Sequence, residues 1–204
     1  MRADKTCSEE YRAAPAGEGV GQLTLYLGGA KSGKTRLALA RAETKPPPRL
    51  YLATAQALDG EMAERIRRHQ AERGPGWRTL ESPLAPDQTL AALAGDQVVL
   101  LDCLTLWLNN LLADGAEDDQ ILGRSRDLLR AIAAYAGPVI VVSNEVGGGI
   151  VPLNALARRF RDLAGEINQR FAAQADRVIM AVAGLEWPLK MQKPDKLKAG
   201  GAGF

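Results

Sequence analysis

Histidine and cysteine are scarce in this chain. Its 204 residues include one histidine, His69, and two cysteines, Cys7 and Cys103, which lie far apart in the sequence. Two cysteines cannot build a disulfide framework, and these few residues cannot form a zinc-type ligand set. The composition therefore excludes the disulfide-rich secreted class and is typical of a reduced, cytoplasmic protein.

Charge of one sign and long apolar runs are also lacking. Lys and Arg total 26 against 24 Asp and Glu, so the formal net charge is only +2. That balance is too even to indicate nucleic acid as the main partner. No run approaches the roughly 18 consecutive apolar residues that a membrane-spanning helix requires, so we expect no membrane insertion. The 46% hydrophobic content instead predicts a folded globular core.

Apolar strand-like runs alternate with helix-like segments through most of the chain. We expect strands at 23–27, 49–53, 97–102, 138–143 and 177–183, the last of these being the final strand, and helices at 34–42, 61–72, 121–135 and 153–173. This alternation is typical of βαβ units and predicts one α/β domain over 22–190, with a mostly parallel sheet and helices on both faces. We expect the polar segments 1–21 and 191–204 to be a flexible leader and a flexible tail.

A phosphate-binding motif follows the first strand. The pattern G-x-x-x-x-G-K-[ST] is matched in full by Gly28, Gly29, Ala30, Lys31, Ser32, Gly33, Lys34 and Thr35. Glycines let backbone N–H groups turn toward a polyphosphate, and the helix N-terminus favours an anion. Lys34 would then reach the β and γ phosphates, and the Thr35 hydroxyl would ligate Mg²⁺. The motif predicts a P-loop; the alternative is a glycine turn that happens to precede a helix.

Two apolar runs end in carboxylates. Asp102 ends the run 98–102, and Glu145 follows the run 139–143. Ligands of open α/β sheets bind at the carboxyl edge of the strands, so we expect both carboxylates to lie at the same edge as the P-loop. Asp102 would help to hold Mg²⁺, and Glu145 would contact or deprotonate an acceptor hydroxyl. The alternatives are a strand-capping aspartate and, for the glycine-rich segment 144–152, a hinge or tight turn.

His69 lies in a charged, helix-like segment. Met62, Ile66 and His69 follow the i, i+4, i+7 spacing of one helix face, which predicts that the histidine points inward. The nearby arginines are Arg67, Arg68 and Arg73. They favour an anionic ligand beside the histidine, but they equally fit a solvated face, and the histidine equally fits a core position.

Five sequence blocks, taken in order, carry a family resemblance. They are GGAKSGKT, YLATAQALDGEM, RIRRHQAERGPGWRTLESP, LLDCLTLWLNNLL and SNEVGGGIVPLNALARRFRDLAGEINQ, and they extend from about residue 23 to residue 190. Together they resemble the bifunctional adenosylcobinamide kinase and adenosylcobinamide-phosphate guanylyltransferase family of cobalamin biosynthesis. The resemblance implies a P-loop NTPase-type α/β fold, usually in a homotrimer; the Mg²⁺ cofactor is the expectation that the P-loop itself carries.

The same resemblance implies two successive reactions. The aminopropanol hydroxyl of adenosylcobinamide is phosphorylated by ATP or GTP, and GMP from GTP is then joined to that phosphate through a guanylylated histidine, which corresponds to His69. The nucleotide-binding residues that it implies are the P-loop 28–35, Ala53, Thr54, Ala55, Gln70, Ala71, Glu72, Arg73, Glu81 and Asp102.

Two other functions stay open on the residues alone. One is a P-loop kinase for another small alcohol, in which His69 is structural. The other is a GTPase switch, which would carry an N-K-x-D guanine motif after a later strand. The chain has no such motif, and the D-x-x-G pattern at 162–165 falls within a helical segment. Corrinoid-dependent consumption of GTP separates these functions from the family reactions.

Overall fold

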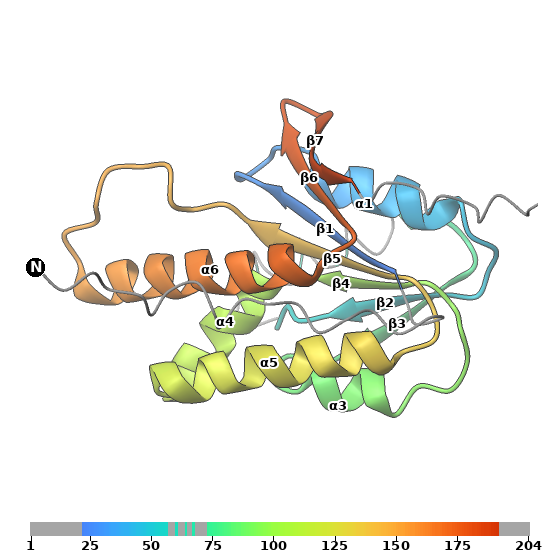
Figure 1. The fold of residues 1–204 in the computed structure, drawn as a ribbon, viewed down its shortest axis with the longest axis horizontal. Helices are drawn as coiled ribbons and strands as arrows, with labels where there is room; N and C mark the ends of the chain where they lie inside the picture. Colours follow the sequence, from blue (N-terminus) through green and yellow to red (C-terminus); the bar gives the residue numbers. More distant parts are fainter. Residues whose placement is uncertain (1–21, 57–59, 61–63, 65–66, 68–72, 192–204) are drawn as a thin grey trace, which may run out of the picture.

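The computed structural model describes residues 22–56, 60, 64, 67 and 73–191 (Figure 1). At its centre lies a seven-stranded sheet in the order β3-β2-β4-β5-β1-β6-β7. The strands are β1 (Leu23–Gly28), β2 (Arg49–Ala53), β3 (Trp77–Glu81), β4 (Val99–Asp102), β5 (Val139–Asn144), β6 (Arg177–Val182) and β7 (Leu185–Met191). All neighbouring strands are parallel except β7, which runs antiparallel to β6.

Helices cover both faces of this sheet. They are α1 (Lys34–Glu43), α3 (Pro86–Ala91), α4 (Leu104–Ala113), α5 (Asp118–Ala134) and α6 (Ala155–Gln174). Ala38 and Ala42 of α1 pack with Tyr26 and Tyr51 on one face. Helices α3, α4, α5 and α6 form the larger core on the other face (Figure 1). The continuous apolar runs of β1, β4 and β5 are explained by this burial, because strands covered on both faces need no polar alternation.

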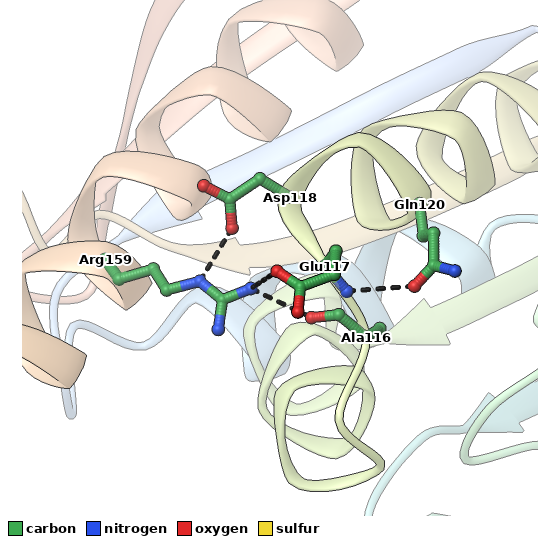
Figure 2. A network of polar contacts seen from close by, with 5 residues as sticks. All are labelled: Ala116, Glu117, Asp118, Gln120 and Arg159. Carbon is green, nitrogen blue, oxygen red and sulfur yellow. Dashed lines mark hydrogen bonds and ion pairs between the residues drawn. The ribbon is translucent and has the colours of Figure 1, made fainter.

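A polar network fastens the start of α5 to α6 (Figure 2). Arg159 of α6 donates from Nε to Asp118 at 2.6 Å and from Nη2 to the carbonyl of Ala116 at 2.9 Å. Gln120 accepts from the backbone N–H of Glu117 at 2.9 Å, which is half of a capping box at this helix N-terminus. These bonds join the N-terminus of α5 to α6 on the face of the sheet that carries the larger core.

The expected fold class is confirmed, with corrections to its element list. The bounds of each expected strand lie within two residues of those of an observed strand. The sequence did not predict β3, β7, α3 or α4. The strand at 177–183 is not the last, because a turn at Ala183 and Gly184, both with positive φ, leads into β7. Met191, assigned to the tail, is the final residue of β7. The expected helix 61–72 falls mostly outside the described residues.

The two missed strands lie at the edges of the sheet. Trp77–Glu81 is short and only partly buried, and Leu185–Met191 is exposed along its whole length and contains a proline. Neither carries the continuous apolar run that marks the central strands, so the sequence gives no clear signal for them. None of the helices in the part of the chain that the structure describes is long and apolar enough to cross a membrane.

Candidate active site

The carboxyl ends of β1, β4 and β5 meet at one edge of the sheet. Gly28 at the end of β1 pairs in register with Asn144, and Asp102 pairs with Val142 of β5. The backbone N–H of Glu145 donates to the carbonyl of Gly28 at 3.1 Å. The expected placement of Asp102 and Glu145 at the edge that holds the P-loop is therefore confirmed, while their roles stay predictions.

The P-loop joins β1 to α1 in a tight turn. Lys31 and Gly33 have positive φ, of 56° and 91°, and α1 begins directly after Gly33 without a side-chain cap. The first turn of α1 thus offers backbone N–H groups of the kind that bind anions at a helix N-terminus. A Cβ on Gly28 would lie 2.7 Å from the carbonyl oxygen of Ala181, so the loop needs glycine there for close approach as well.

The β6–β7 hairpin packs against this loop. Gly184 donates from its backbone N–H to the carbonyl of Ser32 at 2.9 Å, and Arg36 donates from Nη2 to the carbonyl of Gly184 at 3.1 Å. A Cβ on Gly33 would lie 3.0 Å from the Cα of Gly184. Tyr26 donates to Glu186 of β7 at 2.7 Å. The hairpin that the sequence did not predict therefore fixes one side of the P-loop.

Lys34 and Thr35 start α1 and face the edge of the sheet. The Nζ of Lys34 donates to the carbonyl of Gly29 at 3.0 Å, so the ammonium group lies back over the loop. The Oγ1 of Thr35 donates to Oδ2 of Asp102 at 3.2 Å. This pairing of the P-loop hydroxyl with a strand-end carboxylate is the arrangement that holds Mg²⁺ in P-loop NTPases.

Asp102 has a second partner that the sequence did not reveal. Tyr51 donates from its hydroxyl to the same Oδ2 atom at 2.7 Å. Burial raises the pKa of Tyr51 well above its ordinary value, and the negative charge of Asp102 raises it further, so the phenol stays a proton donor. The guanidinium Cζ of Arg73 lies 3.7 Å from the centroid of the Tyr51 ring. Arg73 also donates to Thr79 at 3.2 Å.

Thr54 braces the strand end beside Asp102. Its hydroxyl donates to the carbonyl of Cys103 and accepts from the backbone N–H of the same residue, both at 2.8 Å. Its backbone N–H donates to the carbonyl of Asp102 at 3.1 Å, and its own carbonyl accepts from Asn110 at 2.8 Å. These bonds engage each polar atom of Thr54, so we interpret this predicted nucleotide-binding residue as a support for the site. Burial raises the pKa of the adjacent Cys103 thiol to about 11.

The other predicted site residues divide into two groups. Ala53 ends β2 and pairs in register with Glu81, which ends β3, so both lie at the carboxyl edge, with Ala55 two residues beyond Ala53. Four predicted residues lie outside the described residues: His69, Gln70, Ala71 and Glu72. Arg73, the next residue along the chain, lies against Tyr51, so the described end of this segment reaches the site.

Asn144 is a further site residue that sequence analysis missed. It donates from Nδ2 to the hydroxyl of Thr105 at 2.6 Å, and its carbonyl accepts from Asn168 of α6 at 3.0 Å. Glu145 accepts from the backbone N–H of Gly147 at 2.7 Å, which orders the start of the glycine-rich segment. A polar residue at the end of a buried strand was the available signal, but its partners come from helices distant in the sequence.

The sheet, the P-loop and the strand-end carboxylate together define a P-loop NTPase-type protein. Two solved structures share this fold. One is a Pyrococcus horikoshii OT3 protein, with a TM-score of 0.53, 11% identity, and coverage of 85% of this chain and 88% of that one. The other is an ATPase of a bacterial type III secretion system, with a TM-score of 0.52, 14% identity, and coverage of 83% and 58%. At these identities the likeness concerns the fold alone.

The family model described as cobinamide kinase / cobinamide phosphate guanyltransferase matches residues 24–189, and the chain belongs to this family. A bifunctional adenosylcobalamin biosynthesis protein of Pseudomonas aeruginosa is 49% identical over 168 residues, covering 81% of this chain and 96% of the relative. One from Salmonella typhimurium is 44% identical over 181 residues, covering 82% and 99%. The resemblance seen in the sequence is thereby confirmed, and the chain is an enzyme of the transferase class.

Proposed function

We propose that this protein phosphorylates the aminopropanol hydroxyl of adenosylcobinamide with ATP or GTP and then transfers GMP from GTP to the new phosphate. The products of the second step are adenosyl-GDP-cobinamide and pyrophosphate. The observation that carries the proposal is the Thr35–Asp102 contact beside Lys34, at the sheet edge of a chain that matches the family model over 24–189. Positioning and charge neutralisation are what phosphoryl transfer chiefly requires, and this edge offers both.

The donor atoms at this edge fit Mg²⁺. Thr35 and Asp102 present hydroxyl and carboxylate oxygens, the hard ligands that Mg²⁺ prefers. Within the described residues no group of three or more metal-ligating side chains exists. That sparse set suits a cation held by one or two protein groups together with phosphate oxygens. When bound, the cation would neutralise phosphate charge; Lys34 and the N-terminus of α1 add to that neutralisation.

Glu145 is the proposed contact for the acceptor hydroxyl. It follows β5 at the same edge as the P-loop, and its backbone N–H donates a hydrogen bond to the carbonyl of Gly28. Its carboxylate already orders Gly147 at the start of the glycine-rich segment. A carboxylate so placed would accept the hydroxyl proton as the phosphoryl group is transferred.

His69 is the proposed nucleophile of the guanylyl transfer. A ring nitrogen attacks the α phosphate of GTP, a nitrogen–phosphorus bond forms, and the bond to the leaving pyrophosphate breaks. An oxygen of adenosylcobinamide phosphate then attacks the same phosphorus and releases the histidine. Support comes from the family block that contains His69 and from Arg73, which follows it by four residues and contacts Tyr51, the hydrogen-bond partner of Asp102.

Labelling with GTP that carries radioactive phosphorus at the α position, without corrinoid, tests this mechanism. We expect a covalent label that is lost in acid and survives base, because a phosphoramidate has that stability. His69→Ala should lose the label and the guanylyl transfer, yet still phosphorylate the corrinoid with ATP through Lys34. Label at the wild-type level in His69→Ala would refute the covalent mechanism. Loss of the kinase activity as well would show that His69 serves both steps or the fold.

We further propose that the chain assembles as a homotrimer through the open edge of β7. Four apolar side chains of β7 are 51–72% exposed: Leu185, Trp187, Leu189 and Met191. Leu185 and Trp187 share one face of the strand, and a register shift against β6, at Leu189, separates them from Met191. An exposed apolar edge strand is a template for pairing with another chain, so burial by a second copy would explain its composition.

A further inference from the structure

Tyr51 occupies a position that the two proposed reactions do not yet explain. It lies in β2, two residues before the strand ends, and pairs in register with Leu100 of β4. Residues two apart share a face of a strand, so Asp102 projects from β4 on the same side as Leu100 and Tyr51. That side is the one covered by α1, which carries Thr35. The sheet register therefore brings the phenol to Asp102 from within the core.

The two hydrogen bonds to Asp102 converge on a single oxygen. Thr35 and Tyr51 both donate to Oδ2, at 3.2 and 2.7 Å. A short bond from a buried phenol to a carboxylate is charge-assisted and resists rotation of the carboxylate. If Thr35 turns to a cation, as proposed, the bond from Tyr51 still holds Asp102.

The tyrosine ring is held on two sides. The guanidinium group of Arg73 lies over its face, 3.7 Å from the centroid, and Trp77 meets it edge-on with centroids 6.3 Å apart and planes at 78°. A cation over a ring face and an edge-to-face aromatic pair are both favourable arrangements. Arg73 is itself fixed to Thr79 of β3. The position of the hydroxyl is therefore set by neighbours from outside the P-loop.

We propose that Tyr51 is a positioning residue of the phosphoryl-transfer site, whose hydroxyl fixes the orientation of the Asp102 carboxylate that would hold the divalent cation. Arg73 and Trp77 hold Tyr51 in turn. The inference rests on the proposed function, since it takes Asp102 to face the cation of the bound nucleotide. A tyrosine that merely satisfies its hydroxyl in the core would contribute stability without affecting the cation.

The variant Tyr51→Phe isolates the hydroxyl, because it keeps the ring and its contacts with Arg73 and Trp77. The probe is Mn²⁺, whose binding to the enzyme with a non-hydrolysable GTP analogue is followed by electron paramagnetic resonance. We expect Tyr51→Phe to weaken Mn²⁺ binding by about tenfold, as loss of a hydrogen bond to a charged group predicts. Binding of the analogue without metal should stay within about twofold of wild type, since Lys34 is untouched.

Tyr135→Phe is the matched control. Tyr135 and Tyr51 are each 5% exposed. The hydroxyl of Tyr135 donates to the carbonyl of Gln97 at 2.8 Å. Gln97 precedes β4, whereas Asp102, the partner of Tyr51, ends that strand. The control loses a neutral hydrogen bond at equal burial, so it should lose somewhat less stability and bind Mn²⁺ like wild type. Wild-type Mn²⁺ binding in Tyr51→Phe, or equal weakening in both variants, would overturn the proposal.

A kinetic readout distinguishes positioning from damage to the fold. Tyr51→Phe should need about tenfold more Mg²⁺ for half-maximal corrinoid phosphorylation and should recover most of its turnover at saturating Mg²⁺. A variant that is simply misfolded would not be rescued by the cation, and that outcome contradicts the proposal. Failure of the wild-type enzyme to phosphorylate the corrinoid would instead refute the proposed function, so the two failures are separable.

Discussion

Replacing Thr54 by valine tests whether the two hydrogen bonds between its hydroxyl and Cys103 stabilise the strand end beside the site. The side chain is 0% exposed, and valine keeps its shape while removing both hydrogen bonds to Cys103. The carbonyl of Cys103 retains a bond from the backbone N–H of Trp107 at 3.1 Å, but the N–H of Cys103 loses its partner. An orphaned buried donor costs about 1–3 kcal/mol and the lost second bond about 1 kcal/mol, so we expect Thr54→Val to lower the free energy of unfolding by about 2–4 kcal/mol.

Urea unfolding, followed by the fluorescence of the buried Trp107, measures this loss. Thr54→Ser is the matched control, because serine keeps the hydroxyl and should cost clearly less. Corrinoid phosphorylation should also fall in Thr54→Val and not in Thr54→Ser, since Asp102 directly precedes the residue that loses its brace. A loss below about 0.5 kcal/mol, the range of ordinary surface substitutions, would refute the bracing role. So would equal losses in the two variants.

Two further substitutions test the proposed chemistry and assembly. Lys34→Ala should reduce kinase turnover by about a thousandfold, because it removes charge that stabilises the transferred phosphoryl group; turnover within about threefold of wild type, about 0.65 kcal/mol of barrier, would contradict that role. Trp187→Lys should convert the proposed homotrimer to monomer in sedimentation analysis, because it places charge among the exposed apolar side chains of β7. Leu153→Lys, at a 99% exposed position just before α6, should leave the proposed trimer intact.

The central part of the fold could be predicted because its signals are local. Leu23–Gly28, Val99–Asp102 and Val139–Asn144 are apolar enough to be recognised as buried strands from their own residues. The P-loop is likewise a contiguous motif, and its strand–loop–helix context can be checked within the same stretch of sequence. Placing Asp102 and Glu145 at the P-loop edge needed only the rule that parallel strands end at the same edge.

The edges of the fold gave weaker signals. Trp77–Glu81 lies at the edge of the sheet and pairs only with β2. It mixes polar with apolar residues, so no periodicity marks it as a strand. Leu185–Met191 does alternate, but Pro188 within it argues against a central strand, and its apolar residues are exposed. Such a strand is stabilised by pairing with β6 and, under the proposal above, by another chain. Neither partner can be inferred from the seven residues themselves.

The contacts around Asp102 show a different limit. The sequence offers the carboxylate and the P-loop threonine, but Tyr51 reaches Asp102 only because β2 lies beside β4 in this strand order. In the sheet, β2 lies between β3, which follows it in the chain, and β4. Chain order predicts the first of these neighbours but not the second. A motif therefore identifies the groups that meet the nucleotide, whereas the groups that hold them in place depend on sheet order. For this reason the contact of Tyr51 with Asp102 could not be predicted, although Tyr51 begins one of the five sequence blocks that carry the family resemblance.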